Sequence, residues 1–357
     1  MYEPPLGLFY ENALLENGNP TIISLNLAPG QPGAPPYPAV LTGAPTGVGA
    51  SASIRTVNAD FKTQHAMMSH VQVERALTSD LAVSVAYVNA TGRSLPYIFN
   101  SNVIPTGATL PDGRPIYSTT ASAATRVIPS FDTIREVRSE GTSQYNALTL
   151  SVARRMSHGV QASGFYTLAK ARDNGVIGSD YVVGSTDRQA LSDPSDPRRD
   201  YSYTAWNQTH TFVMTTIVQP SMQGDGIGAR LANDNQIGLI VKANSGLPYN
   251  VRSNRDLNLD GIPDADRPNG IARNSGKLGT FVTVDMRYSR FVPLTRLQKA
   301  EVFAELKNML NRRNIRAVNS VVVTDALGNL TTPNPAEFPL TQTYEARQFQ
   351  LGFKYSF

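Results

Sequence analysis

Alternating oxygen-bearing side chains in the last third of the chain form its most specific chemical motif. Asp256, Asn258 and Asp260 stand at alternate positions and are followed by Gly261. This spacing matches the first half of a twelve-residue calcium loop, in which carboxylate and amide oxygens bind the ion and the glycine allows a sharp turn. The pattern predicts a calcium site within residues 253–278.

The second half of the predicted calcium loop is incomplete. Its seventh position would use the carbonyl of Ile262 and its ninth is Asp264, but the twelfth, where a bidentate Glu belongs, is Arg267. Asp266 or another loop would have to supply the missing oxygens. A second interpretation remains open, in which the same residues form an acidic surface loop held by ion pairs with Arg255 and Arg267. The predicted metal ligands are Asp256, Asn258, Asp260 and Asp264.

Catalytic chemistry finds little support in the sequence. The four histidines lack metal-ligand spacing, and the Gly-x-Ser-x-Gly signature of a hydrolase does not occur. Glycines at 224, 226 and 228 are spaced as in some phosphate-binding loops, but no convincing helix follows them, so they are interpreted as a turn. We therefore expect no enzyme activity and no cofactor other than calcium.

Composition fits an exported β protein and argues against nucleic acid as a partner. The chain has 357 residues, 41% of them hydrophobic, and no cysteine. A β-barrel with a wet interior needs apolar side chains on one face of each strand, so this content suffices. The formal net charge is +4, but the arginines occur as scattered pairs and form no basic stripe with interleaved aromatics.

The last ten residues indicate the fold class. Phe349, Leu351, Phe353, Tyr355 and Phe357 alternate with polar residues or glycine up to the end of the sequence. Strict alternation is the pattern of a strand with one apolar face and one wet face. The closing strand of an outer-membrane barrel carries such a face into lipid and places aromatic residues at the membrane interface. These five residues are therefore predicted to face the membrane.

Similar alternation along the chain predicts about ten antiparallel strands. Nine full strands match or exceed the roughly 9–11 residues that a tilted strand needs to cross a bilayer. They are expected near residues 67–76, 81–91, 143–156, 160–172, 204–219, 235–252, 279–292, 298–311 and 346–357. A tenth, truncated strand is expected near residues 7–10. Charged side chains on two of the full strands must face a watery interior, because charges are costly against hydrocarbon. They are Asp285, Arg287, Glu301, Glu305 and Lys307.

The connections between the predicted strands alternate between short turns and long loops. The long connections are 11–66, 92–142, 173–203, 253–278 and 312–345. Short periplasmic turns and long extracellular loops are typical of outer-membrane barrels. We therefore expect an all-β, antiparallel transmembrane barrel portion in the outer membrane of a Gram-negative-type envelope, in contact with lipid. A soluble secreted β-sandwich that acts as a binding module is the alternative fold.

Several short motifs follow one another in a fixed order along the chain. They are VNADFKT at 57–63, YVNATGR at 87–93, QYNAL at 144–148, YTLAKARDN at 166–174, DPRRDY at 196–201, HTFV at 210–213, DLNLDG at 256–261, DRP at 266–268 and ELKNMLNRRN at 305–314. This ordered set resembles the TonB-dependent outer-membrane receptors of the Oar-like type. The resemblance implies energised import of a ligand of unknown identity through a barrel of about 22 strands that surrounds an N-terminal plug.

Residues 1–357 resemble only the C-terminal part of such a barrel. The plug and the N-terminal strands have no counterpart in them, and Met1–Pro5 have no export-signal features, so we expect a fragment of a longer protein. By the resemblance, the TonB complex would act only through the missing plug, and barrel-assembly machinery would engage the C-terminal strand. A non-transporting surface or adhesion barrel is the alternative function.

Overall fold

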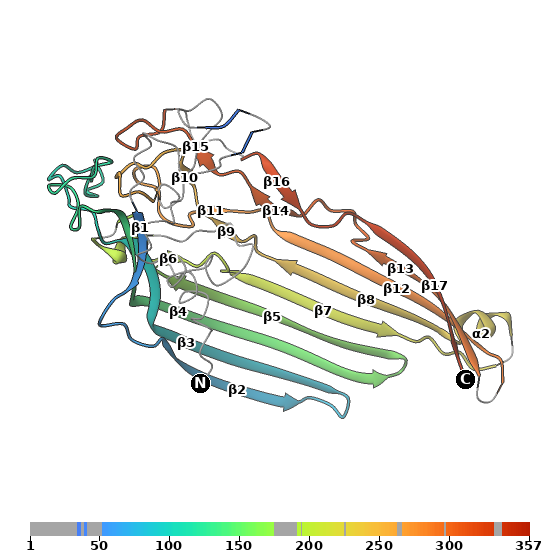
Figure 1. Ribbon diagram of the computed structural model, residues 1–357. Coiled ribbons are helices and arrows are strands. Elements are labelled where there is room, and N and C mark those ends of the chain that lie inside the picture. Colours follow the sequence, from blue (N-terminus) through green and yellow to red (C-terminus); the bar gives the residue numbers. More distant parts are fainter. Residues whose placement is uncertain are drawn as a thin grey trace.

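One large sheet dominates the structure, which is a computed structural model (Figure 1). The structure describes residues 34–36, 39–40, 52–174, 191–193, 195–224, 226–262, 266–295, 298–331 and 338–357. Nine strands succeed one another across the sheet in chain order, each antiparallel to the next. They are β2 (His65–Ala76), β3 (Leu81–Asn100), β4 (Phe131–Ser157), β5 (Val160–Asp173), β7 (His210–Val218), β8 (Asn235–Asn244), β12 (Phe281–Pro293), β13 (Lys299–Lys307) and β17 (Gln348–Ser356). The nine full strands predicted from the sequence are thereby confirmed, with different ends.

The register between neighbouring strands gathers apolar side chains on one surface, which we call the outer face. Val85 of β3 lies opposite Leu150 of β4, which lies opposite Tyr166 of β5. Met214 of β7 lies opposite Val241 of β8 in the same way. A shift of one residue in any of these pairings would turn the apolar set of a strand to the other face. The opposite surface, the inner face, carries small and polar side chains, among them Ser84, Thr149, Thr167, Thr215, Lys242, Asp285 and Glu305.

The outer face carries no second layer among the described residues. Leu150 and Phe353, for example, are 47% and 68% exposed. A soluble β-sandwich would bury this face against another sheet, so the sandwich alternative is wrong. β2 and β17 form the two edges of the sheet and do not pair with each other in the described part of the chain. The strands therefore form an open portion of a barrel wall.

Strands β3 and β4 extend beyond the ends predicted from the sequence. Their ladder continues past an irregularity near Gly92 as far as the pair Asn100–Arg135. Gly141 permits this, because a Cβ there would lie 2.6 Å from the backbone oxygen of Leu95. The connection between the strands is therefore 101–130, and the predicted limits of 92–142 were wrong.

Packing on both faces explains the wrong limits. Tyr97, Phe99 and Leu191 form a buried hydrophobic cluster, and Ile134 and Val137 are buried nearby. A strand segment that contacts protein on both faces loses the alternation that marks a strand between lipid and water. The extension therefore has no period-two signal in the sequence.

The other long connections also contain short ordered elements. β1 (Ala52–Val57) lies parallel to β4. The remaining elements are β6 (Ser202–Tyr203), β9 (Pro248–Tyr249), β10 (Arg252–Ser253), β11 (Gly276–Lys277), β14 (Ile315–Val318), β15 (Val321–Val322), β16 (Leu340–Thr343) and the 3-10 helix η1 (Pro197–Asp200). Several predicted strands are shorter than expected. The largest differences are that β7 begins at His210, β8 ends at Asn244 and β13 ends at Lys307. The tenth predicted strand, near 7–10, lies outside the described residues.

The connection 220–234 contains a short helix, α2 (Ile227–Ala232), so the interpretation of its glycines as a simple turn was wrong. The side-chain amide of Asn235 donates to the carbonyl of Leu231 at 2.5 Å, and the guanidinium of Arg290 donates to another helix carbonyl at 2.9 Å. These bonds satisfy carbonyls that the end of a helix leaves without an internal partner. No helix in the described ranges is long and apolar enough to cross a membrane.

Candidate functional site

The long connections fold together into a layer at one end of the sheet, which we call the cap. It comprises the described parts of 101–130, 191–209, 245–280 and 308–347, and it lies at the end of the strands opposite α2 (Figure 1). In the described part of the chain, every buried charged side chain belongs to the cap or to the adjoining end of β5. These residues are Arg114, Arg126, Asp173, Asp193, Asp200, Asp260, Asp266, Arg267 and Arg273. In outer-membrane barrels, the end with the long connections is extracellular.

Arg114 joins the connection between β3 and β4 to the one that contains the predicted calcium loop. Its Nη1 lies 2.7 Å from Oδ1 of Asp266, and its Nε lies 2.9 Å from Oδ2 of Asp112. Its Nη2 donates to the backbone oxygen of Arg267 at 2.9 Å. The second carboxylate oxygen of Asp266 accepts the backbone N–H of Leu257 at 2.7 Å. Buried charges are tolerated when they are paired and hydrogen-bonded in this way, so the two connections are held in one geometry.

Arg267 and Arg273 tie the same connection to the one between β5 and β7. Nη2 of Arg267 donates to the hydroxyl of Ser192 at 2.8 Å and forms an ion pair with Asp200. Asp200 also accepts the backbone N–H of Ser192 at 2.8 Å. Arg273 pairs with Asp173 at the end of β5, and its Nε donates to the backbone oxygen of Asp200 at 3.0 Å. Burial lowers the pKa of Arg273 to about 10, so this arginine stays charged at neutral pH.

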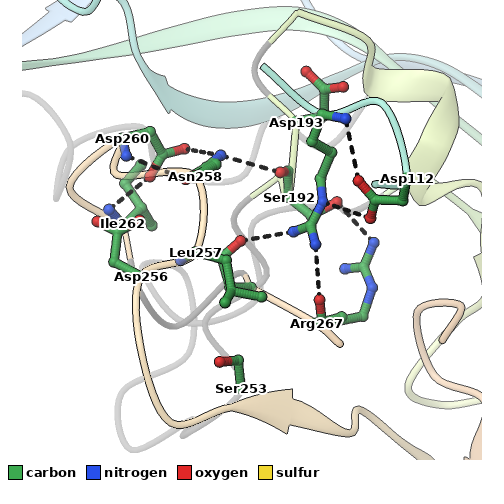
Figure 2. A network of polar contacts seen from close by, with 12 residues as sticks. Asp112, Ser192, Asp193, Ser253, Asp256, Leu257, Asn258, Asp260, Ile262 and Arg267 are labelled. Carbon is green, nitrogen blue, oxygen red and sulfur yellow. Dashed lines mark hydrogen bonds and ion pairs between the residues drawn. The ribbon is translucent and has the colours of Figure 1, made fainter. Parts of the chain in front are cut away.

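Three of the four predicted metal ligands lie together in the cap (Figure 2). Oδ2 of Asp256 accepts the backbone N–H of Gly261 at 2.9 Å, and Gly261 has a positive φ of 85°. The sharp turn expected at this glycine is therefore confirmed. Asn258 donates from Nδ2 to Oδ2 of Asp260 at 3.2 Å. The fourth predicted ligand, Asp264, lies outside the described residues.

The fit of this loop to calcium is partial. Oδ1 of Asp256 is buried without a hydrogen-bond partner, which suits a cation ligand, but the side-chain oxygens of Asn258 and Asp260 accept hydrogen bonds within the loop. Among the described residues, no group of three or more His, Cys, Asp or Glu side chains could hold a metal ion. Arg267 occupies the twelfth position and pairs with Asp200. Calcium binding remains a prediction that needs further oxygens, such as those of Asp264.

Burial raises the pKa of two carboxyl groups in the cap. The pKa of Asp260 rises to about 7, first because the group is buried and then because the Asp256 carboxylate is close. The pKa of Asp266 rises to about 8 through burial and the charge of Asp260, and the opposing effect of Arg114 is smaller. Both groups therefore exchange protons near neutral pH, and the charge of the cap changes in this range.

The interior charges predicted from the sequence lie on the inner face, and three of them, Arg287, Glu301 and Glu305, pair with one another. Nη1 of Arg287 lies 2.7 Å from Oε1 of Glu305, and its Nη2 lies 2.8 Å from Oε1 of Glu301. The guanidinium carbon lies 3.9 Å from the ring centroid of Phe303, and Gly352 of β17 leaves room for that ring, which a Cβ would overlap. A concavity of about 420 Å³ on this face is lined in part by Asp285, Arg287, Glu305 and Lys307.

The C-terminal residues predicted to face the membrane lie on the outer face. Four of them stand opposite apolar residues of β13: Phe349 opposite Leu306, Leu351 opposite Ala304, Phe353 opposite Val302 and Tyr355 opposite Ala300. Phe357 directly follows β17 and is exposed. Their position suits contact with lipid, which remains a prediction for these individual residues.

A family model described as an outer membrane beta barrel domain matches residues 3–280 of this sequence. The chain belongs to this family. Membership in the outer membrane beta barrel domain family, together with the exposed apolar outer face, assigns the protein to the outer membrane as a β-barrel. No curated protein was found to match the sequence.

Solved structures of outer-membrane proteins are similar to this beta barrel domain at low sequence identity. The outer membrane transporter YddB from Escherichia coli is 10% identical with a TM-score of 0.47, over 83% of this chain and 33% of YddB. The ferric-catecholate import receptor Fiu from Escherichia coli is 13% identical with a TM-score of 0.42, over 84% and 28%. The FrpB iron transporter from Neisseria meningitidis is 12% identical with a TM-score of 0.44, over 85% and 33%. The chain spans about a third or less of the length of these proteins.

The arginines that organise the cap were not predicted from the sequence. Arg114 and Asp266 are 152 residues apart, and Arg267 and Ser192 are 75 residues apart. The motif DRP at 266–268 entered the family resemblance, but nothing in its spacing indicates these partners. The one local signal is the run of acids beside arginines in the connections, and it does not specify which residues pair.

Proposed function

We propose that the protein is the C-terminal barrel portion of a TonB-dependent receptor of the Oar-like type, and that its cap captures a ligand for energised import. The cap is the observation that carries this proposal. Its connections are joined by buried ion pairs, so they present a shaped surface before any ligand arrives. Preorganisation of this kind lowers the entropic cost of binding.

The inner face supports a transport role. Arg287, Glu301 and Glu305 form a paired charged cluster there, and the hydroxyls of Thr149 and Thr167 hydrogen-bond at 2.9 Å. A polar interior suits the passage of a hydrated ligand. These groups pair with each other, and we propose a receptor without enzyme activity.

The proposed role implies three partners. Lipid would contact the outer face, and the barrel-assembly machinery would engage β17, whose free edge ends the sheet. The TonB complex would act through an N-terminal plug, as the family resemblance implies, and not through the residues described here.

The test measures uptake in living cells that produce the full-length protein. Cells with and without the protein are given a panel of labelled iron chelates and glycan fragments, with and without a protonophore that collapses the inner-membrane gradient. We expect uptake of at least one compound to require both the protein and the gradient. Equal uptake in both strains for the whole panel, or uptake that ignores the protonophore, contradicts energised import.

One observation favours a second candidate, a non-transporting surface or adhesion barrel. Trp206, the single tryptophan of the chain, lies in the cap and is 75% exposed. Exposed aromatic residues of this kind often anchor protein–protein contacts. If adhesion is the function, Trp206→Ser lowers attachment of cells to a surface, while uptake of every compound in the panel is the same with and without the protein.

A further inference from the structure

Helix α2 lies at the turn end of the sheet, between β7 and β8, and leaves two apolar side chains exposed (Figure 1). Ile227 is 79% exposed and Leu231 is 71% exposed, whereas Ala229 is 3% exposed. An α-helix turns by about 100° per residue, so Ile227 and Leu231 lie on one side of α2 and Ala229 lies on the opposite side. The two apolar side chains therefore point away from the surface on which the helix rests.

Side chains of the outer face hold α2 in place. Asn235 shares the outer face with Val241 of β8, because every second side chain of a strand lies on one face, and Arg290 of β12 stands opposite Asn235. The guanidinium of Arg290 donates to the carbonyl of Arg230 at 2.9 Å, and the amide of Asn235 donates to the carbonyl of Leu231 at 2.5 Å. The C-terminal end of α2 is therefore bound to the outer side of the sheet.

The connection around α2 is also held by bonds of its own. The side chain of Asn233 accepts the backbone N–H of Met222 at 2.7 Å and donates to the carbonyl of Met222 at 3.0 Å. A Cβ at Gly228 would lie 3.3 Å from the sulfur of Met222, so the glycine allows this side chain to lie against the helix. Met222 is 55% exposed. It adds a third apolar side chain to the exposed surface of this connection.

The outer face changes from apolar to charged at the level of α2. Arg75, Arg154 and Arg290 lie on the outer face near the ends of β2, β4 and β12 that lead into the short turns. Arginine is tolerated beside lipid where its guanidinium reaches the headgroups. Tyr288, on the same face as Arg290, donates its hydroxyl to Asn235 at 2.7 Å, and aromatic residues gather at the same level. The hydrocarbon therefore ends near these residues, and α2, which Arg290 binds, lies at the level of the headgroups.

This position selects lipid as the partner of the exposed side chains. The adjoining outer face is apolar, and the bilayer that covers it reaches α2 without a break. Arg230 is exposed in the last turn of α2, beside the apolar pair. Helices with an apolar side and neighbouring basic residues lie in the membrane interface, with the apolar side chains at the boundary between headgroups and acyl chains.

We propose that α2 is an interfacial anchor whose Ile227 and Leu231 enter the periplasmic leaflet of the outer membrane. Their partners are phospholipids, contacted where the headgroups meet the acyl chains. The anchor fixes the depth at which the turn end of the barrel wall sits in the bilayer. This inference goes beyond the proposed function, because it requires insertion in a membrane and neither a ligand nor energised uptake.

Residues 1–357 contain no cysteine, so one introduced cysteine gives a single label in this part of the chain. Any cysteine elsewhere in the full-length protein is first replaced by serine. Ile227→Cys and Leu231→Cys are each coupled to a polarity-sensitive fluorophore, and the protein is placed in vesicles of phosphatidylethanolamine and phosphatidylglycerol. Leu351→Cys on the outer face and Leu327→Cys in the cap, which are 69% and 52% exposed as leucines, are the references for lipid and for water.

Two kinds of quencher then report the surroundings of each label. One is a spin label attached to the lipid acyl chain, either near the headgroup or near the chain end, and the other is iodide on both sides of the vesicle. We expect the quencher near the headgroup to act on both α2 labels roughly threefold more strongly than on the label at Leu327, and iodide to act correspondingly less. The quencher near the chain end should act most strongly on the label at Leu351.

Two outcomes overturn the inference. If iodide quenches both α2 labels as strongly as the label at Leu327, α2 lies in water. If both α2 labels are shielded from iodide and from every lipid quencher, protein covers α2, either another segment of the full-length chain or a second copy. The two positions lie one helical turn apart, so a local disturbance at one of them leaves the other informative, and heat-modifiable migration on gels checks that each labelled variant is folded.

Discussion

The wall, formed by the nine long strands of the sheet, and the cap differ in where they place charged side chains. In the wall, apolar side chains such as Leu351 point outward and the paired charges of Arg287 and Glu305 lie on the inner face. In the cap, Asp266 and Arg273 are almost completely buried. The difference follows from the surroundings, since hydrocarbon penalises every polar group on the outer face, whereas a water-exposed cap can bury charges that are paired. The wall is therefore stabilised by the contact of its outer face with lipid and by the hydrogen bonds between its strands. The cap is stabilised by specific ion pairs.

The largest effect should come from removing one partner of a buried ion pair. Arg114→Met leaves Asp266 buried without its cation, and above pH 8, where Asp266 is ionised, breaking such a pair costs about 3–5 kcal/mol. We expect rapid protease cleavage and fast hydrogen exchange in the cap, while urea unfolding of the wall in lipid vesicles keeps its midpoint. The exposed Arg198→Met serves as the control. If the wall loses as much stability as the cap, the two regions are not independent and the comparison is wrong.

A charge on the outer face should affect the wall and leave the cap intact. Leu351→Arg places a cation against hydrocarbon near the middle of β17, which costs about 2–4 kcal/mol. The matched variant Gln350→Arg places the same residue on the inner face opposite Glu305 and should be nearly neutral. Urea unfolding in lipid vesicles and heat-modifiable migration on gels measure the difference. Equal effects of the two variants would show that this strand does not separate lipid from water.

The cap should become more stable as the pH falls through the neutral range. The pKa of Asp260 is raised from 3.8 in the unfolded chain to about 7, and that of Asp266 to about 8. Between the unfolded and folded pKa values the folded state holds protons that the unfolded state has lost, so stability decreases as pH rises, from about 4 to about 7 for Asp260 and to about 8 for Asp266. Hydrogen exchange in the cap at pH 5.5 and pH 8 measures this slope. Asp260→Asn should flatten it, and an unchanged slope in that variant would assign the effect to other groups.

Calcium should have the smallest effect and reverse the sign of the pH dependence. Extracellular calcium modules bind in the range of about 10⁻⁴–10⁻³ M, and the ion needs ionised ligands. If Asp256, Asp260 and Asp264 bind calcium, added calcium protects the cap more at pH 8 than at pH 5.5, and Asp256→Ala abolishes the protection. Magnesium is the control. Calorimetry without heat of binding, with unchanged proteolysis, would leave the loop as a hydrogen-bonded turn.

The sequence by itself determined the wall. Alternation along segments such as 282–288 and 349–357 gave the strands, their faces and the inner position of Glu301, because a strand between lipid and water has to alternate at every step. This requirement is local, so the pattern of adjacent residues in the sequence shows it. The prediction of strands from alternation failed at 92–100, because protein covers both faces of the strand there and alternation is not required.

Only the tertiary structure decided the cap. The sequence placed Asp256, Asn258 and Asp260 in one turn, since that geometry depends on neighbours in the chain. It could not pair Arg114 with Asp266 or Arg267 with Asp200, because these contacts depend on the paths of several long connections. An ion pair between distant residues needs two suitable side chains and a fold that brings them together. The spacing of residues along the sequence does not indicate which distant residues the fold brings into contact.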